Sequence, residues 1–361
     1  MRQTDEDLGA WIRLSLVPGL DSGRCRALLS AFGLPSEILR TPPTKLERVL
    51  APAMVKAISN PEWDIRVEQT LEWSQQEGHA ILTLADEEYP RQLLEISDPP
   101  PLLYVIGDAG CLGKPSIAIV GSRSSTPQGR QNAGQFARAL SDAGLTIVSG
   151  LALGIDAAAH EGGLQGLGST VAVMGTGPDT IYPKSNRALA EKIAEHGALI
   201  TEYPVGTPAL PANFPRRNRL IAGLSRGVLV VEAAVASGSL ITARMALEQG
   251  REVFAIPGSI HSPVSRGCHA LIKQGAKLVE TAEDVLVELQ LPVLQESETR
   301  KPQMSDKMNG LLRHMGYDPC DRDTLGARCG LTADAVSAML LQLELEGRVG
   351  SLPGGLYQRL K

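Results

Sequence analysis

The sequence predicts an α/β protein, in which a doubly wound, mostly parallel sheet lies between a helical N-terminal domain and a small C-terminal domain. Three observations predict this fold class. Short apolar runs alternate with helical segments through the middle of the chain. Two helical patterns flank a Pro-Gly pair near the N-terminus, and a helix-turn-helix pattern followed by a hairpin pattern ends the chain. We expect domains at residues 1–80, 81–290 and 307–361, with a linker at 291–306.

The first domain, residues 1–80, is expected to be helical. The segment Trp11–Leu20 and the following Cys25–Leu29 predict two short helices around the Pro18-Gly19 turn. This order is similar to a SAM-like or helix-hairpin-helix unit, whose turn can present backbone N–H groups to a phosphate. The alternative is a small helical packing module, which is favoured because the surrounding segment is acidic and repels phosphates.

The second domain, residues 81–290, is predicted to have a Rossmann-like fold. Helical segments such as Gln128–Ala143 and Asn186–His196 are each followed by a glycine. Strands that are apolar on both faces and alternate with helices form a parallel sheet that is covered on both sides. The predicted strands are Ile117–Val120, Thr146–Val148, Thr170–Met174, Ala198–Thr201, Gly227–Glu232 and Glu252–Ile256.

The last domain, residues 307–361, is predicted to be a winged helix. The segments Asp323–Thr332 and Val336–Val349 predict helix, turn and helix, and Pro353-Gly354-Gly355 predicts a hairpin turn. Such a unit often contacts duplex DNA, but the second helix carries acidic residues, so contact with a protein or a structural role is an equally good explanation. The preceding residues 291–306 are rich in Glu, Ser, Thr, Pro and Gln, as is typical of a linker.

Composition indicates a folded protein of 361 residues, of which 43% are hydrophobic and 21% are charged. No apolar run approaches 18 residues and the first residues are polar, so we expect no membrane span, no signal peptide and a cytoplasmic location. The net charge is −5, yet residues 116–280 carry 15 basic and 11 acidic residues, against 20 and 29 elsewhere. The middle of the chain is therefore its basic part, although basic faces are often only solvated surface.

The common nucleotide and metal motifs are not matched. Gly175–Thr180 begins like a dinucleotide fingerprint but has a proline where the helix should open, and Gly113-Lys114 is followed by Pro115 instead of Ser or Thr. The five cysteines and six histidines lack metal-ligand spacing. A packing or capping role is expected for His160, because no orienting partner can be named. We expect no cofactor, no metal and no catalytic residue.

Three loops rich in glycine and serine follow predicted strands: Gly121–Ser125, Ser149–Asp156 and Gly238–Ala243. Open α/β sheets bind ligands at the carboxyl ends of their strands, and Gly and Ser let backbone N–H groups approach an anion closely. Arg123 follows the first Gly-Ser pair and can bind a phosphate with two nitrogens. Each loop alone is also explained as an ordinary tight turn. Together the loops predict an anion site.

The segment Asn213–Ile221 places three arginines and two asparagines beside one aromatic ring, Phe214. This composition suits the neutralisation of phosphates together with base stacking, which is worth roughly 1–3 kcal/mol per base. The alternative is that Phe214 and Leu220-Ile221 are core residues and that some arginines only pair with carboxylates.

Long ordered motifs in this part of the chain resemble the core of the DNA-processing protein A (DprA, or Smf) family. The motifs are Ile119–Arg123, Ser149–His160, Tyr182-Pro183, Asn213–Ser225 and Ser237–Ala243. The resemblance covers about Tyr89 to Leu289, and both terminal domains match the family's longer members. It implies a cytoplasmic homodimer, not an enzyme, that binds single-stranded DNA with little sequence preference. The family resemblance also implies that the protein protects incoming DNA and loads the RecA recombinase in natural transformation and recombination.

The same resemblance implies the residues of the DNA-binding site. Arg123 is expected to bind phosphate, and Phe214 and its neighbouring arginines to line the pocket. The residues expected to complete the pocket, mainly through hydrogen bonds, are Ser149, Gly150, Asn218 and Ser239. Self-association is expected around Cys268–Leu289. The implied site residues are Gly121, Ser122, Arg123, Ser149, Gly150, Gly154, Asn213, Phe214, Arg216, Arg217, Asn218, Arg219, Gly238 and Ser239.

A nucleotide-processing enzyme with a related fold, such as a phosphoribohydrolase, is the alternative function. Such enzymes have a Pro-Gly-Gly-x-Gly-Thr site with a downstream glutamate. The Pro-Gly-Gly of this chain, Pro353–Gly355, continues as Leu356-Tyr357 and lies outside the predicted core. Because a fold does not determine a function, this absence of the motif is the main argument against the enzyme.

Overall fold

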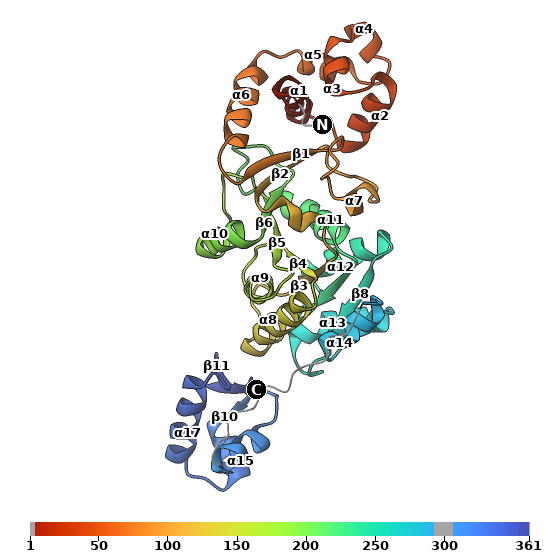
Figure 1. Cartoon of the computed structure of the whole chain (residues 1–361). Coiled ribbons are helices and arrows are strands. Elements are labelled where there is room, and N and C mark those ends of the chain that lie inside the picture. The colour runs from red at the N-terminus through yellow and green to blue at the C-terminus, as the bar shows by residue number, and fades with distance from the viewer. Residues whose placement is uncertain (1–3, 292–305, 361) are drawn as a thin grey trace.

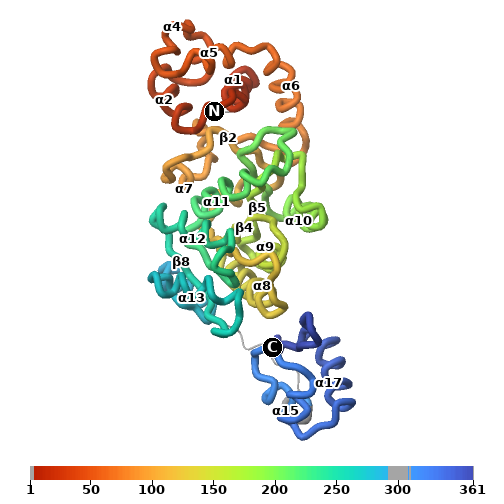
Figure 2. The backbone as a smooth tube through the Cα atoms, turned by 180° about the vertical axis from the view of Figure 1, so that it is seen from behind, coloured from red at the N-terminus to blue at the C-terminus, as the bar shows by residue number. Residues whose placement is uncertain are grey.

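The computed structural model describes residues 4–291 and 306–360 (Figure 1). The predicted linker, residues 291–306, lies almost wholly outside the described residues. The helical N-terminal segment, the central sheet and the C-terminal segment follow one another along the long axis of the molecule (Figures 1 and 2).

The N-terminal segment is helical, as expected, and its helices begin at residues that suit helix starts. Thr4 and Asp21 each accept a hydrogen bond from a backbone N–H in the first turn, and three later helices begin with proline. In the turn between the first two helices, the N–H groups of Leu20 and Asp21 donate to Val17 and Gly19. The helices are α1 (Asp5–Leu16), α2 (Ser22–Phe32), α3 (Pro35–Arg40), α4 (Pro43–Leu46), α5 (Pro52–Ile58) and α6 (Glu62–Ser74).

The central sheet confirms the predicted doubly wound, mostly parallel fold. Its strand order is β1-β2-β6-β5-β4-β3-β7-β8-β9, and all neighbours from β6 to β9 are parallel. The strands are β1 (His79–Thr83), β2 (Leu102–Gly107), β3 (Ser116–Val120), β4 (Thr146–Ser149), β5 (Thr170–Val173), β6 (Ala198–Thr201), β7 (Gly227–Val230), β8 (Glu252–Ala255) and β9 (Lys277–Leu278).

Three of these strands were not predicted from the sequence. Strands β1 and β2 precede the repeating pattern, and both β1–β2 and β2–β6 are antiparallel pairs. Strand β9 has only two residues, too few for an apolar run. Leu102 at the start of β2 packs with Trp11, Ile12 and Leu16 of α1, so the helical segment shares a core with this border of the sheet.

Helices cover both faces of the sheet. Ile117 and Ile119 of β3 pack with α8 and α9 on one face, whereas Ala118 and Val120 pack with α11 and α12 on the other. This alternation follows from the two-residue period of a strand. The helices are α7 (Arg91–Leu94), α8 (Pro127–Asp142), α9 (Ile155–Gly163), α10 (Arg187–His196), α11 (Asn213–Leu224), α12 (Ser239–Glu248), α13 (Arg266–Lys273) and α14 (Ala282–Glu288), with 3-10 turns at Ala109–Gly113, Lys184–Asn186 and Pro263–Ser265.

The strand order reverses between β3 and β7, which are neighbours in the sheet. After β3 the chain passes through α8 to β4 on one side, and after β7 it passes through α12 to β8 on the other. The two connections diverge and leave a crevice at the carboxyl ends of β3 and β7. In open α/β sheets, ligands bind at such a reversal.

The C-terminal segment is the predicted winged helix. Its antiparallel sheet has the order β10-β12-β11, and Gly354 and Gly355 adopt positive φ angles in the β11–β12 turn. Helix α17 is the second helix of the predicted helix-turn-helix, and its Leu341 and Leu345 are 59% and 82% exposed. The elements are α15 (Asp306–Met315), β10 (Cys320–Asp321), α16 (Arg322–Cys329), α17 (Ala333–Leu345), β11 (Val349–Leu352) and β12 (Leu356–Arg359).

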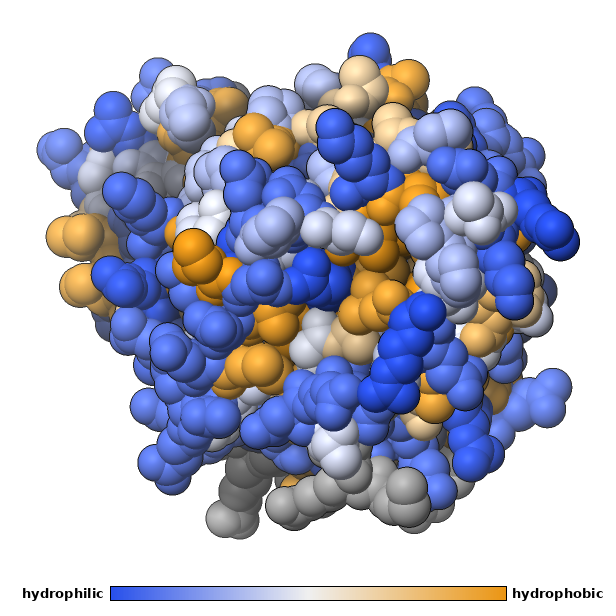
Figure 3. Space-filling view, turned by 90° about the horizontal axis from the view of Figure 1, so that it is seen from above, coloured by the Kyte–Doolittle hydropathy of each residue, from blue (hydrophilic) through white to orange (hydrophobic). Residues whose placement is uncertain are grey.

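The surface seen from the N-terminal end is mainly hydrophilic, with apolar side chains in several separate places (Figure 3). Among the described residues, no helix combines the length and the apolar character needed to cross a membrane.

Candidate nucleic-acid interface

A cavity of about 630 Å³ lies at the carboxyl ends of β3 and β7, where the strand order reverses. Three segments that are distant in the sequence form most of it: the loop after β3, one face of α11, and the loop that leads into α12. Ala152, Asp156 and Tyr182 also line it. The predicted site residues that line the cavity are Gly121, Ser122, Arg123, Phe214, Arg217, Asn218, Gly238 and Ser239.

The loop after β3 is fixed by its neighbours on both sides. The N–H of Ser122 donates to the Glu232 carbonyl at 2.7 Å, and the N–H of Ile155 donates to the Ser122 carbonyl at 3.2 Å. A Cβ on Gly121 would lie 2.6 Å from Ile155 Cγ1 and 2.8 Å from the Glu232 carbonyl oxygen. Only glycine fits this approach of strand, loop and helix. The following Arg123 side chain is exposed at the mouth of the cavity.

Helix α11 presents one face to the cavity. Phe214, Arg217, Asn218 and Ile221 line it, and their spacing of three, four and seven residues places them on one side of a helix. The guanidinium carbon of Arg123 lies 5.9 Å from the centre of the Phe214 ring. The face therefore combines an aromatic ring with positive charge.

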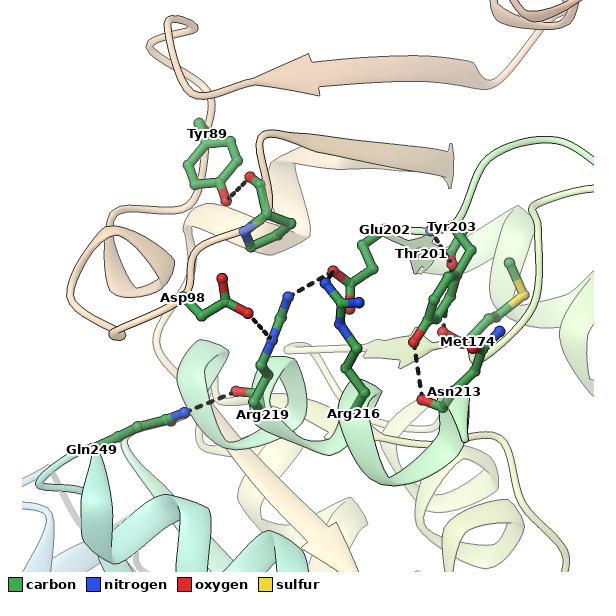
Figure 4. Close-up of polar contacts among 11 residues, drawn as sticks. Tyr89, Asp98, Met174, Thr201, Glu202, Tyr203, Asn213, Arg216, Arg219 and Gln249 are labelled. Carbon is green, nitrogen blue, oxygen red and sulfur yellow. Dashed lines mark hydrogen bonds and ion pairs between the residues drawn. The ribbon is translucent and has the colours of Figure 1, made fainter. Parts of the chain in front are cut away.

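Arg216 and Arg219 lie on the opposite side of α11, and neither lines the cavity. The Arg219 guanidinium contacts Glu202 at 2.6 Å and Asp98 at 3.2 Å, and Arg216 lies 3.8 Å from Glu202 (Figure 4). This placement corrects the expectation that all three arginines line the pocket, because the helical period turns two of them toward carboxylates. Burial raises the pKa of the Glu202 carboxyl, although the two arginines oppose the shift.

Asn213 holds the start of α11. Its side-chain amide donates to the Gly175 carbonyl at 3.1 Å. Its own carbonyl accepts from the Tyr203 hydroxyl at 3.1 Å (Figure 4). Gly175 packs under the Phe214 ring, where a Cβ would lie 2.8 Å from Cδ1. Asn213 thus supports the orientation of Phe214 and does not itself line the cavity.

The loop after β4 reaches the cavity through Ala152 and Asp156, whereas the predicted site residues Ser149 and Gly150 do not line it. The Ser149 hydroxyl is buried and donates to the Ile119 carbonyl at 2.7 Å. The N–H groups of Gly150 and Ala152 donate to Asp156 Oδ2 at 3.1 and 3.4 Å. The backbone nest that the sequence predicts for a phosphate is therefore filled by the chain's own carboxylate.

Arg217 lies beside this carboxylate and is 4% exposed. Its Nη1 donates to the Gly150 carbonyl at 2.8 Å and also to the Val173 carbonyl. Burial lowers the pKa of Arg217 to about 10 and raises the pKa of the Asp156 carboxyl. The floor of the cavity therefore carries a fixed cation whose charge is partly balanced by Asp156.

Gly154 ends the loop after β4 and packs closely against the loop after β3. Its φ angle is +79°, and a Cβ there would overlap the Ser122 carbonyl and lie 2.8 Å from the Arg123 carbonyl oxygen. Gly154 lies outside the cavity lining but keeps the Arg123 loop in place.

The loop before α12 completes the cavity. The hydroxyls of Ser237 and Ser239 lie 2.7 Å apart, and the Asn218 amide donates to the Gly238 carbonyl at 3.4 Å. Helix α12 begins at Ser239 with its first N–H groups at this side of the cavity. A helix N-terminus favours a negatively charged ligand.

Tyr182 and Asp156 also line the cavity, although the sequence prediction assigned a role to neither. Tyr182 is 46% exposed, and the centre of its ring lies 5.3 Å from the centre of the Phe214 ring. Asp156 contributes a carboxylate to the lining. Tyr182 stands in a motif of the family resemblance, but a single aromatic residue far from Phe214 in the sequence gives no signal of contact with it.

His160 is a structural residue. It is fully buried, its Nδ1 lies 2.7 Å from the Thr170 hydroxyl, and its Nε2 accepts from the Leu151 N–H at 3.3 Å. Burial lowers the pKa of His160 to about 3, so the ring is neutral at ordinary pH.

Comparison with known proteins gives two family matches. The family model described as DNA recombination-mediator protein A matches residues 80–290, and the DprA winged helix domain matches residues 295–355. The chain is 45% identical over 304 residues to Protein Smf of Escherichia coli (strain K12), which covers 82% of this chain and 81% of the relative. It is 49% identical over 208 residues to DNA processing protein DprA of Streptococcus pneumoniae, covering 58% and 73%.

Two solved structures are similar. The X-ray structure of DNA processing protein A from Streptococcus pneumoniae has a TM-score of 0.69 at 38% identity, covering 80% of this chain and 99% of that chain. The structure of DNA processing protein A from Helicobacter pylori has a TM-score of 0.54 at 31% identity, covering 60% and 97%. That structure is described as showing a unique single-stranded DNA binding mode. Sequence, fold and winged helix agree that this chain belongs to the DNA recombination-mediator protein A family, whose members are named DprA or Smf.

Proposed function

We propose that this chain is a non-catalytic protein that binds single-stranded DNA in the cavity between β3 and β7. The observation that carries the proposal is the placement of Arg123 over the Phe214 ring at the cavity mouth, with the buried Arg217 beneath. An exposed guanidinium binds a phosphate, and a half-buried ring with a second ring beside it stacks on a base. The Helicobacter pylori relative, described with a single-stranded DNA binding mode, supports the same ligand.

Selectivity for single strands follows from the site chemistry. Stacking on Phe214 requires a base whose face is free, and the faces of bases inside a duplex are covered by their neighbours. Stacking is also tolerant of sequence, because every base has a π-face. We therefore propose binding with little sequence preference.

The proposal is tested by comparing single-stranded oligonucleotides of several different sequences with the matching duplexes in a gel-shift titration. We expect much tighter binding of the single strands, with an affinity that falls as salt rises because neutralised phosphates release counterions. Equal affinity for both forms would contradict the proposal.

Arg123→Ala is expected to weaken single-stranded DNA binding by roughly tenfold or more, since a charge-assisted hydrogen bond contributes about 1.5–3 kcal/mol. The side chain is exposed, so the free energy of unfolding should change little. Titration of the variant measures the affinity, and circular dichroism during thermal unfolding serves as the control. Unchanged affinity would remove Arg123 from the interface.

We further propose that the bound strand is protected and passed to RecA in natural transformation and recombination, and that the chain acts as a cytoplasmic homodimer joined around Cys268–Leu289. The family resemblance supports these steps. Light scattering after size-exclusion chromatography tests the dimer. The rate of RecA filament nucleation on protein-bound DNA tests loading.

The nucleotide-processing enzyme remains the alternative function, because the cavity lies where related folds bind nucleotides. Incubation of the protein with nucleoside monophosphates decides between the DNA-binding protein and the enzyme. Release of a base or of phosphate with turnover would favour the enzyme over the non-catalytic protein.

A further inference from the structure

Glu232 lies just after β7, at the point where the strand order reverses, and its carboxylate points away from the DNA cavity. It lines a second cavity, of about 280 Å³, together with Thr126 and with residues of the C-terminal segment such as Tyr317. The proposed DNA contacts do not use this side chain. A half-buried carboxylate beside an anion-binding loop needs an explanation, because its charge opposes the approach of DNA.

The hydrogen bonds of Glu232 with the loop after β3 explain its position. Its backbone carbonyl accepts from the Ser122 N–H at 2.7 Å. Its carboxylate accepts from the Thr126 N–H at 2.9 Å and from the Thr126 hydroxyl at 2.6 Å. One residue therefore holds both ends of the segment Ser122–Thr126, and Arg123 lies between these two anchored ends.

Thr126 connects the Glu232 carboxylate to the start of helix α8. It is the N-cap residue, and its hydroxyl accepts from the Gly129 N–H at 2.9 Å. A Cβ on Gly129 would overlap the Glu232 carboxyl group, so the absence of a side chain at Gly129 creates the space for that group. The carboxylate also lies at the N-terminus of a 16-residue helix, where negative charge is favourable.

The opposite side of the segment is held as well. Ile155 donates to the Ser122 carbonyl, and Arg130 Nη1 donates to the Ser125 carbonyl at 2.8 Å. Of these contacts, the pair from the Glu232 carboxylate is the one that fixes the C-terminal end of the segment to β7, across more than 100 residues of sequence. Removing the carboxylate frees that end without touching Arg123 itself.

We propose that Glu232 is a positioning residue for DNA binding, which acts by fixing the Ser122–Thr126 segment so that Arg123 points into the mouth of the cavity. The inference rests on the proposed function for its effect on DNA. Its structural part, the ordering of the segment, does not depend on that function.

The first test measures hydrogen exchange of the DNA-free protein. In Glu232→Ala we expect the Thr126 amide to exchange about fivefold faster or more, since it loses its hydrogen-bond acceptor. Glu232→Gln keeps one amide oxygen as an acceptor and is expected to restore much of the protection. Glu161→Gln, an exposed residue on the neighbouring α9, is the matched control. Wild-type exchange rates at Thr126 in Glu232→Ala would overturn the proposal.

The second test is a double-mutant cycle on single-stranded DNA. If Glu232 acts through Arg123, the losses of affinity in Glu232→Ala and Arg123→Ala will not add in the double variant. The salt dependence should also become shallower in each variant by about 0.7 in the logarithmic slope, as for one lost phosphate contact. Additive losses with an unchanged slope would overturn the proposal. If the wild-type protein binds no single-stranded DNA, the proposed function fails, and the exchange experiment still decides whether Glu232 orders the segment.

Discussion

Arg219→Met is expected to lower the free energy of unfolding by about 3–5 kcal/mol at neutral pH, which is the cost of leaving a buried carboxylate without its cation. Glu202 is 7% exposed in its side chain, and Arg219 contacts it at 2.6 Å. Methionine keeps much of the volume of arginine, so the loss is electrostatic and not a cavity effect. Denaturant unfolding followed by circular dichroism measures it.

Arg216→Met is the matched control, because the same helix supplies it to the same carboxylate. Arg216 is half exposed and 3.8 Å from Glu202, a geometry that contributes about 0–1 kcal/mol. A loss as large as that of Arg219→Met would show that burial does not separate the two arginines.

The deficit of Arg219→Met depends on pH in a defined direction. Burial raises the pKa of the Glu202 carboxyl in the folded state, so this group favours folding most at acid pH and less as the pH rises through that raised value. Loss of Arg219 raises the pKa further. The difference between wild type and variant should therefore narrow as the pH is lowered, and a constant difference would assign the loss to packing.

Gly121→Ala is expected to lower both the stability of the fold and the affinity for DNA. The added Cβ would lie 2.6 Å from Ile155 and 2.8 Å from the Glu232 carbonyl oxygen, and neither can withdraw without moving the backbone. We expect a loss of about 1–3 kcal/mol in stability, as for an overpacked site. The displaced loop moves Arg123, so affinity for single-stranded DNA should fall by roughly tenfold or more. Thermal unfolding and a fluorescence-anisotropy titration measure the two quantities.

Gly238→Ala provides the comparison within the same cavity. No atom of the described residues lies within 4 Å of a Cβ built there, and the residue has helical dihedral angles of −61° and −22°. Alanine should therefore leave the free energy of unfolding near the wild-type value. If Gly121→Ala proves as stable as Gly238→Ala, crowding at Gly121 does not constrain the loop.

The sequence predicts the cavity's place well because that place depends on local patterns. The apolar runs at Ile117–Val120 and Gly227–Glu232 are the strands on either side of the reversal, although the second ends at Val230. The Gly-Ser loops that follow them line the cavity. Strand type, loop composition and the general position of ligands in open sheets are all properties that a short window of sequence carries.

The roles of the individual arginines require the helical period as well. Once Asn213–Leu224 is known to be a helix, positions 214, 217 and 218 fall on one face, while 216 and 219 fall on another. That separation was available from the sequence. The carboxylates that pair with Arg219 could not be identified from the sequence, because Asp98 and Glu202 lie 121 and 17 residues away from it.

The loop after β4 shows a limit of a different kind. Glycine and serine composition predicts a backbone nest for an anion at Gly150, and the nest exists. Its anion is Asp156, six residues along the same chain. Composition cannot distinguish an internal carboxylate from a bound phosphate, because both satisfy the same N–H groups.

The two borders of the nine-stranded sheet differ in a way that bears on self-association. Strand β1 closes one border under the N-terminal helices. The other border ends in β9, a strand of two residues that includes Lys277, and short charged edge strands resist the edge-to-edge addition of another chain. Leu278 and Val287 near this border are 50% and 60% exposed. A homodimer of the kind proposed would therefore join through side-chain packing at this border, and not by extension of the sheet. The same short edge strand also protects the chain from open-ended aggregation, because it does not favour the addition of further strands.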